Sequence, residues 1–200
     1  GNGGEVFGSL ATPRDFAALA KRDLETALRV FEYQDFTEAP FMQDARIRTI
    51  YEGLKGRAGR RNLLEEFLVA LHVKEPVRLS MDTGKRTYGN PLEPVGDSID
   101  IAAGSWGYVS ADIETDAPFI ELVKTKITDR DFVNSRCRIH YRIVPGRLHK
   151  GRNFGRIRVR SLREEFVLEI EAMGDAAADV TGRGIENDGR MDRESLLRYL

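Results

Sequence analysis

The spacing of apolar residues changes at Pro76, and no other feature of the sequence constrains the fold as strongly. Before this residue, apolar side chains recur every three or four positions, as they do on one face of an amphipathic α-helix. After it, apolar and polar side chains alternate, which is the pattern of a β-strand with one buried face. The change predicts a helical subdomain over residues 1–74 and a sheet domain over 75–173. Residues 174–200 are expected to form a linker and the start of a further helical segment.

Three amphipathic stripes predict three helices in the N-terminal part. The first is expected over 13–33, where Thr12 and Pro13 have the residue types of an N-cap and of a first helical position. The second is expected to end at Gly56, because glycine readily takes the left-handed conformation that follows many helices. The third is expected to begin at Asn62. Each helix is short and has one apolar face, so the helices must bury these faces against one another or against a neighbouring part.

Seven short segments of alternating pattern follow Pro76, separated by Gly, Pro, Asn and Asp. Strands at this regular spacing are typical of a β-sandwich, whereas a parallel α/β sheet would need helical crossovers that the sequence does not offer. The expected strands lie at 77–81, 98–102, 106–114, 119–124, 138–144, 155–161 and 165–171.

One stretch of the sheet domain resembles a known family. Residues 143–161 read I-V-P-G-R-L-H-K-G-R-N-F-G-R-I-R-V-R-S, and an alternating last strand follows. This is similar to the end of bacterial immunoglobulin-like modules, in which a V-x-P-x-x-L-x-x-G loop leads into G-x-I-x-V-x-S and a final strand. The segments 105–109 and 116–120 correspond to the middle strands of those modules. The resemblance covers about 75–173 and implies a sandwich, but such modules serve as spacers, binding units and interaction domains alike.

The resemblance and the periodicity together give an α+β fold class. We expect an N-terminal three-helix segment packed on a seven-stranded immunoglobulin-like β-sandwich, with a C-terminal linker and short helix. The combination also resembles parts of long uncharacterised bacterial proteins of unknown function. The sequence starts without Met and stops within a helical pattern, so a fragment of a larger bacterial protein is expected.

Composition excludes several classes of protein. The 31 basic and 32 acidic side chains nearly balance, and 41% hydrophobic residues suffice for a buried core. No apolar run is long enough to cross a bilayer, and no secretory signal pattern begins the sequence. One Cys and three His exclude a disulfide framework and a multi-cysteine zinc site, and no cofactor is expected. The compartment stays open, although a lone thiol favours a reducing cytoplasm.

Ten basic residues and no acid lie between positions 132 and 163. On alternating strands the arginines share outward faces, so two rows on one sheet would form a patch for phosphate or another anionic polymer. The sandwich order implied by the resemblance would instead place the rows on opposite sheets, and outward glutamates of 165–171 would pair with one row. Three interpretations therefore stay open: a solvated ion-paired face, a docking surface for an acidic protein, and a nucleic-acid site. The same argument makes the nucleic-acid site unlikely. The candidate anion-binding residues are Arg136, Arg138, Arg142, Arg156, Arg158 and Arg160.

Aromatic residues suggest a second kind of site. Trp106 and Tyr108, with Tyr88 and Phe154, are candidates for a glycan-binding platform, since sugars stack on aromatic rings. The alternative is that the large aromatics of the strands pack in the core or at its edge.

Catalytic and metal sites find little support in the sequence. Cys137 falls on the apolar side of its strand and His140 on the opposite side, which indicates a buried structural thiol. Alternating outward carboxylates near 112–116 are more typical of solubility than of a calcium site. No nucleophile-elbow or dinucleotide motif is present, and the run 56–61 is interpreted as a helix connection rather than a phosphate cradle.

The sequence therefore predicts no catalytic and no metal-binding residues. The first hypothesis is a non-catalytic structural or protein-interaction module of a larger bacterial protein, whose partner is another protein or other domains of the same chain. The alternative is a ligand-binding module for an anionic polymer or a glycan.

Overall fold

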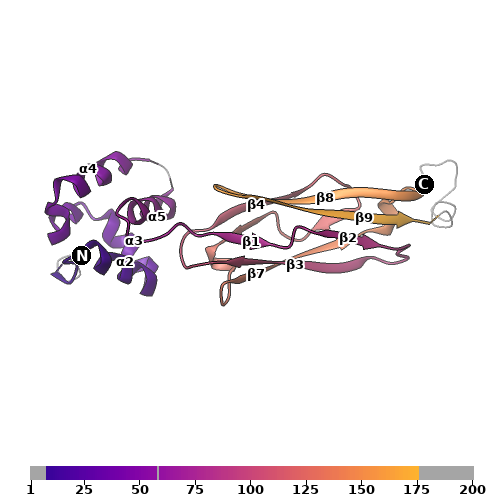
Figure 1. Ribbon diagram of the computed structural model, residues 1–200, viewed down its shortest axis with the longest axis horizontal. Helices are drawn as coiled ribbons and strands as arrows, with labels where there is room; N and C mark the ends of the chain where they lie inside the picture. Colours follow the sequence, from indigo (N-terminus) through magenta and orange to yellow (C-terminus); the bar gives the residue numbers. More distant parts are fainter. Residues whose placement is uncertain (1–7, 58, 176–200) are drawn as a thin grey trace. The chain divides into compact units, whose positions relative to one another are not determined.

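A computed structural model describes residues 8–57 and 59–175 of the 200-residue chain. The described residues form two compact units (Figure 1). One comprises the residues up to Arg78 together with Ser105–Tyr108, and the other comprises Leu79–Gly104 and the residues from Val109 onward. We call them the helical unit and the sandwich unit. The further helical segment expected near the C-terminus lies outside the described residues.

The described part of the helical unit contains four α-helices, not the three that the sequence predicts. They are α2 (Pro13–Arg22), α3 (Leu24–Glu32), α4 (Ala45–Leu54) and α5 (Arg60–Ala70). The expected single helix over 13–33 is wrong because Asp23 interrupts it. Its backbone leaves the helical conformation, with φ −150° and ψ 83°, and its carboxylate accepts a hydrogen bond from the backbone N–H of Thr26 at 3.1 Å, so it caps a new helix.

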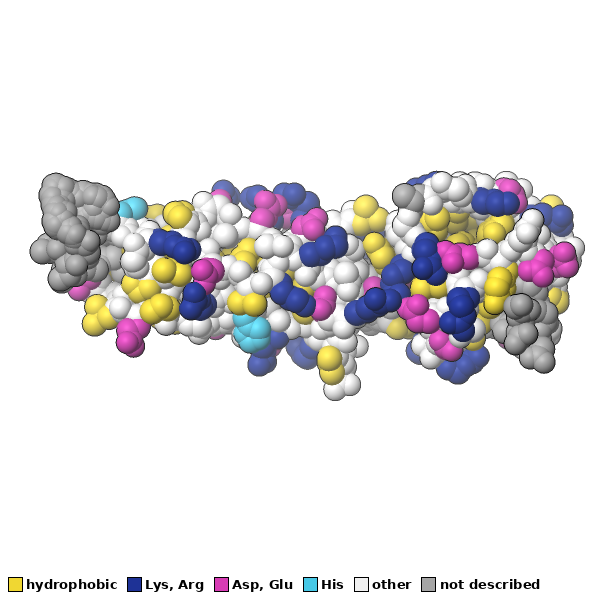
Figure 2. All heavy atoms as spheres, turned by 180° about the vertical axis from the view of Figure 1, so that it is seen from behind, with side chains coloured by type: hydrophobic (Ala, Val, Ile, Leu, Met, Phe, Trp, Pro, Cys, Tyr) yellow, Lys and Arg dark blue, Asp and Glu magenta, His cyan; other side chains and the backbone are white. Residues whose placement is uncertain are grey.

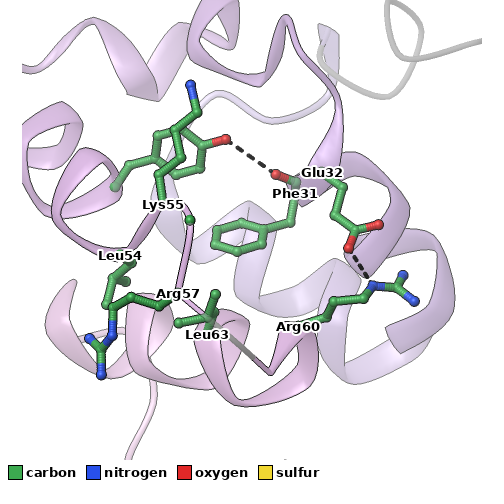
Figure 3. A pocket seen from close by; sticks show the side chains of 9 residues that line it. Phe31, Glu32, Leu54, Lys55, Arg57, Arg60 and Leu63 are labelled. Carbon is green, nitrogen blue, oxygen red and sulfur yellow. Dashed lines mark hydrogen bonds and ion pairs between the residues drawn. The ribbon is translucent and has the colours of Figure 1, made fainter.

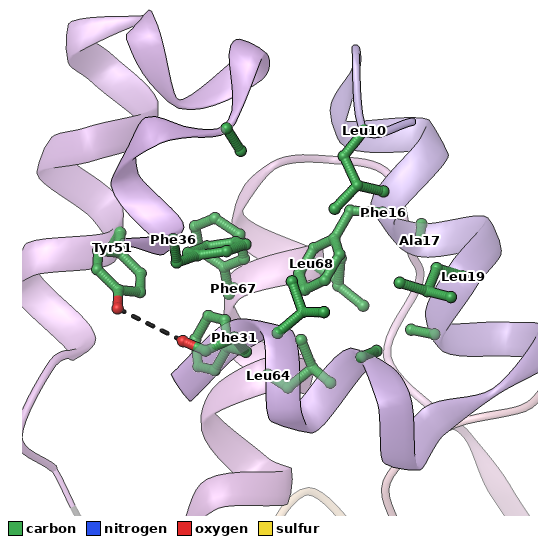
Figure 4. Packing of buried hydrophobic residues seen from close by; sticks show 14 of the residues in the cluster. Leu10, Phe16, Ala17, Leu19, Phe31, Phe36, Tyr51, Leu64, Phe67 and Leu68 are labelled. Carbon is green, nitrogen blue, oxygen red and sulfur yellow. Dashed lines mark hydrogen bonds between the residues drawn. The ribbon is translucent and has the colours of Figure 1, made fainter. Parts of the chain in front are cut away.

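An aromatic cluster forms the core of the helical unit (Figure 4). The ring centroids of Phe16 and Phe36 lie 5.2 Å apart, and those of Phe31 and Phe67 lie 5.4 Å apart. Phe36 comes from the segment between α3 and α4, where two short 3₁₀ turns, Phe36–Glu38 and Pro40–Gln43, bring it into the core. Six buried aromatic rings thus hold together helices too short to be stable alone: Phe16, Phe31, Phe36, Phe41, Tyr51 and Phe67.

The sandwich unit has two sheets that form two layers in Figure 1. One sheet has the order β1-β3-β7-β5 and the other the order β2-β9-β8-β4-β6. All neighbours are antiparallel except β2 and β9, which run parallel. The strands are β1 (Leu79–Met81), β2 (Lys85–Tyr88), β3 (Val95–Ala103), β4 (Ser110–Thr115), β5 (Ile120–Leu122), β6 (Lys126–Thr128), β7 (Arg136–Ile143), β8 (Gly151–Ser161) and β9 (Glu165–Gly174).

The α+β class and the two-sheet sandwich are confirmed, whereas the number of seven strands is wrong. The additional strands include β2 and β6, which are four and three residues long and have few buried side chains to mark an alternation. The strand expected over 106–114 begins later, at Ser110. In β7 the predicted alternation holds throughout, because Cys137, Ile139, Tyr141 and Ile143 are buried and the residues between them are exposed.

Candidate functional site

A pocket of about 310 Å³ opens on the helical unit where α4 ends and α5 begins (Figure 3). Gly56 and Gly59 lie between the two helices, with φ angles of +87° and +90° that other residues rarely adopt. The lining residues are Phe31, Glu32, Tyr51, Leu54, Lys55, Gly56, Arg57, Arg60 and Leu63.

The floor of the pocket is apolar and continuous with the aromatic core. Phe31, Tyr51 and Leu63 are buried, and Leu54 is half-buried beside them. The Tyr51 hydroxyl donates a hydrogen bond to the backbone oxygen of Phe31 at 3.4 Å. Burial raises the pKa of Tyr51, so this hydroxyl stays protonated and is not a base. The face drawn in Figure 2 shows a hollow of this kind in the helical unit, with hydrophobic side chains inside it.

The rim of the pocket carries more basic than acidic groups. Lys55, Arg57 and Arg60 line it, and Glu32 is the one acid among the lining residues. Arg60 forms an ion pair with Glu32, and Arg57 lies 3.3 Å from the carboxylate of Glu66 outside the pocket. In Figure 3 the charged ends of Lys55, Arg57 and Arg60 stand on different sides of the Phe31 ring. The arrangement can bind an apolar group with negative charge around it, but it does not pair a nucleophile with a base.

The predicted anion-binding arginines are divided between the two sheets. Arg136, Arg138 and Arg142 lie on β7 of the four-stranded sheet. Arg156, Arg158 and Arg160 lie on β8 of the five-stranded sheet, so the two rows do not share a face.

Most of these arginines have a carboxylate partner in the same sheet or next to it. Figure 2 shows basic and acidic side chains interspersed over the visible face. The charge that each row would offer to a polyanion is therefore largely neutralised. The pairs are Arg138–Asp100 at 2.9 Å, Arg142–Glu121, Arg156–Asp116 at 3.0 Å, Arg158–Glu165 at 2.7 Å and Arg160–Glu114 at 3.3 Å.

Trp106 and Tyr108, the predicted glycan-binding residues, belong to the helical unit. Trp106 packs against its aromatic core, and the Nζ of Lys74 lies 4.6 Å from the centre of the Trp106 ring. The backbone N–H of Tyr108 donates to Glu65 at 3.2 Å. A lysine already occupies one face of the indole, so that face does not provide an open stacking platform.

The other two aromatic residues of the predicted platform lie in the sandwich unit. Phe154 is exposed on β8, and Tyr88 on β2 is part of a hydrogen-bonded chain. Its hydroxyl donates to Asp97 at 2.6 Å and therefore accepts from the Tyr141 hydroxyl, 2.5 Å away. Arg86 donates to the Tyr141 hydroxyl at 3.0 Å and to the backbone oxygen of Ser98 at 2.7 Å.

This chain of hydrogen bonds links the two sheets, because Arg86 and Tyr88 come from β2 and the other members come from β3 and β7. Burial is the main cause that raises the pKa of Tyr88 and of Tyr141. Burial opposes the ionisation of Asp97, but hydrogen bonds from Tyr88 and from the Ser98 N–H outweigh it and lower the pKa of this carboxyl. This group was not among the residues predicted from the sequence, in which its one signal is the inward-facing position of Tyr141 in its strand.

Cys137 is buried in β7, and burial raises the pKa of its thiol. His140 lies on the exposed side of the same strand. Within residues 8–57 and 59–175, no three His, Cys, Asp or Glu side chains gather as a group that could hold a metal ion.

None of the helices that the structure describes has the length and apolar character needed to cross a membrane.

Comparison with known proteins gives one family and several structures. A family model described as the N-terminal part of a family of unknown function, DUF5717, matches residues 2–200. No curated protein matches the sequence. A PapD-like domain of human CEP192 is 10% identical with a TM-score of 0.37, and the match covers 48% of this chain and 84% of that one. WR4, an MSP family member of C. elegans, is 7% identical with a TM-score of 0.32, over 44% and 92% of the two chains. The apo CBD1 domain of Calx is 13% identical with a TM-score of 0.37, over 50% and 99%.

Proposed function

Because the chain belongs to the DUF5717 N-terminal family, a family of unknown function, we propose that it is a non-catalytic protein-interaction module of a larger bacterial protein. The pocket between α4 and α5 is its contact site. The observation that carries this proposal is the apolar floor of the pocket, which opens to solvent inside a rim of charged side chains. Interfaces commonly centre on such an apolar pocket with a polar surround.

The side chains around the pocket favour binding over catalysis. Tyr51 stays protonated and Glu32 is ion-paired with Arg60, so neither of these two lining residues is a free general base. The groups that the sequence offered for catalysis do not meet there, since Cys137 and His140 lie on opposite faces of a strand in the sandwich unit. These properties support a pocket that binds a ligand without converting it.

The alternative of a site for an anionic polymer or a glycan has less support. Its arginines are separated and mostly ion-paired, and Lys74 lies over the ring of Trp106. The pocket in the helical unit needs neither set of residues.

Affinity capture from a bacterial lysate tests the proposal. The chain, Leu54→Ser and Leu92→Ser are compared as baits, and the retained protein, nucleic acid and carbohydrate are each quantified. Leu54 lines the pocket, whereas Leu92 is an exposed leucine of the sandwich unit that serves as the matched control. We expect a protein that the chain and Leu92→Ser retain and that Leu54→Ser loses while its circular dichroism is unchanged. Capture of nucleic acid alone, or equal capture by all three baits, would contradict the proposal.

A further inference from the structure

We propose that the pocket between α4 and α5 binds a short acidic peptide segment that carries one bulky apolar side chain. The apolar side chain enters the floor, and carboxylates on either side of it meet Lys55 and Arg57 on the rim. This inference rests on the proposed function and names the chemistry of the partner at that site.

The size of the pocket sets the size of the group that enters it. A volume of about 310 Å³ lies at the lower end of the range for small-molecule sites. It accommodates a single large side chain rather than a nucleotide-sized cofactor. The floor of Phe31, Leu54 and Leu63 offers dispersion contacts and no polar group that would require a polar ligand. One aromatic or branched aliphatic side chain meets these conditions, as an anchor residue does in a protein interface.

The charges of the rim select the residues that flank this anchor. Three lining side chains are basic and one is acidic. Glu32 is engaged by Arg60, and Lys55 has no ion-pair partner among the described residues. Arg57 and Arg60 keep more than half of their side chains exposed despite their ion pairs. The rim therefore attracts carboxylates and repels basic flanking residues.

The positions of the basic groups favour a peptide over an amphiphile with a single head group. In Figure 3 the ends of Lys55, Arg57 and Arg60 stand on three sides of the floor. A fatty acid has one carboxylate and can meet only one of these sides when its chain fills the floor. A peptide whose anchor lies between acidic residues reaches two sides at once, so its charges and its apolar group contribute together.

Fluorescence polarisation with labelled nine-residue peptides tests this inference on the 200-residue chain. The first peptide has one phenylalanine between two pairs of glutamates. The second replaces the phenylalanine with glycine, and the third replaces the glutamates with lysines. We expect the first to bind at least about tenfold more tightly than either of the others, with weaker binding at higher salt. Unlabelled decanoate is added as a competitor that represents a single-headed amphiphile.

Two charge-reversal variants provide the matched control. Lys55→Glu reverses a charge on the rim, and Lys21→Glu reverses an exposed lysine near the end of α2, away from the pocket. We expect Lys55→Glu to weaken the first peptide by about fivefold or more and Lys21→Glu to leave it unchanged.

The outcomes separate this inference from the proposed function. If the phenylalanine peptides bind equally well with glutamates or lysines and Leu54→Ser abolishes both, the pocket is a protein site but the acidic preference is wrong. If decanoate binds and the peptides do not, the ligand is an amphiphile and the inference is overturned. If no peptide binds while Leu54→Ser still loses its captured protein, the inference fails and the proposed function stands.

Discussion

The Nζ of Lys74 lies 2.9 Å from Oε2 of Glu65, and the two side chains are only 2% and 10% exposed. The ammonium also donates to the backbone oxygen of Glu75 at 2.9 Å, and the other carboxylate oxygen accepts from the N–H of Tyr108. Each charge is thus buried together with its partner and with further hydrogen bonds. The pair holds the segment Ser105–Tyr108 within the helical unit.

Removal of one member of this pair is expected to destabilise the helical unit strongly. Lys74→Ala leaves the Glu65 carboxylate buried without its counter-ion, a change that typically costs about 3–5 kcal/mol of unfolding free energy. Trp106 is the single tryptophan and lies against Lys74, so its fluorescence during urea unfolding reports on this unit. The double variant Glu65→Leu/Lys74→Met should regain part of the loss, since no unpaired charge stays buried. The exposed pair of Arg46 and Asp44 is the control, and Arg46→Ala should leave the unfolding curve in place. Equal curves for Lys74→Ala and Arg46→Ala would contradict the expectation.

The close approach at Gly107 gives a second test of the same contact. Gly107 has a φ of +136°, and a Cβ at this position would lie 2.4 Å from Nζ of Lys74 and 2.7 Å from Oε1 of Glu65. Gly107→Ala is therefore expected to lower the unfolding free energy by more than about 2 kcal/mol, through backbone strain and displacement of the ion pair. Gly53 in α4 has open space around it, so Gly53→Ala should instead stabilise the helical unit by about 0.5–1 kcal/mol. Thermal unfolding of the two variants checks the opposite signs, and a stabilising Gly107→Ala would show that the described contact is absent.

The fold class could be predicted from the sequence because its apolar residues follow two clear spacings, the helical one before Pro76 and the strand alternation after it. Apolar stripes are long enough in α2 to α5 to show the helical period, and β7, β8 and β9 alternate over eight or more residues. The break at Asp23 was missed since the apolar stripe continues across it while the capping bond acts locally. The strands β2 and β6 are four and three residues long and contain a single buried side chain, Ile127, so tertiary pairing rather than sequence pattern defines them.

The candidate site could not be predicted in the same way. The pocket depends on how residues of α3, α4 and α5 come together in space, and hydrophobic periodicity contains no such information. The run 56–61 reads in the sequence as a helix connection, and it does lie where α4 ends and α5 begins. The pairing of Glu65 with Lys74 also left no signal, because the two residues are nine positions apart and meet only after α5 has ended.

Tyr88 and Tyr141, which link the two sheets, are expected to make the unfolding free energy fall in alkaline solution. The pKa of Tyr88 and of Tyr141 is raised above the ordinary value of 10.0, mainly by burial. Above about pH 10 the unfolded chain releases these protons while the folded chain retains them, so the unfolding free energy falls as the pH rises. Below that pH, the contribution of these two hydroxyls to the unfolding free energy is fully present. Each such group contributes a slope of at most about 1.4 kcal/mol per pH unit.

Urea unfolding between about pH 8 and pH 11, followed by far-UV circular dichroism, checks this expectation. Tyr88→Phe removes one titrating hydroxyl and should make the alkaline decline shallower, although the loss of its hydrogen bonds costs about 1–2 kcal/mol at neutral pH. Tyr51 and Cys137, whose pKa values are also raised by burial, contribute to the decline in every variant. A decline equally steep in Tyr88→Phe would show that this hydroxyl ionises as readily in the folded chain as in the unfolded one.

Carboxylates form ion pairs with the arginines on the exposed face of β8. We therefore expect these carboxylates, rather than the number of arginines, to determine whether this face binds polyanions. Arg156 pairs with Asp116, and Glu165 lies within 4 Å of both Arg158 and Arg160. The chain should therefore elute from a heparin column at low salt, because neighbouring carboxylates neutralise the positive charge of the β8 arginines. The variant Asp116→Asn/Glu165→Gln removes two of these partners and leaves the arginine row with a net positive charge, so it should elute at distinctly higher salt.

A control with the same net charge separates local from global effects in this experiment. Asp35→Asn/Glu93→Gln also removes two exposed carboxylates, but neither forms an ion pair with the β8 arginines. If elution follows net charge alone, both double variants shift equally. If it follows the arrangement of charges, only Asp116→Asn/Glu165→Gln shifts, and this is the result we expect because the arginines of β8 already stand in one row. Tight binding of the unaltered chain at physiological salt would instead mean that the arginines bind polyanions in spite of their partners.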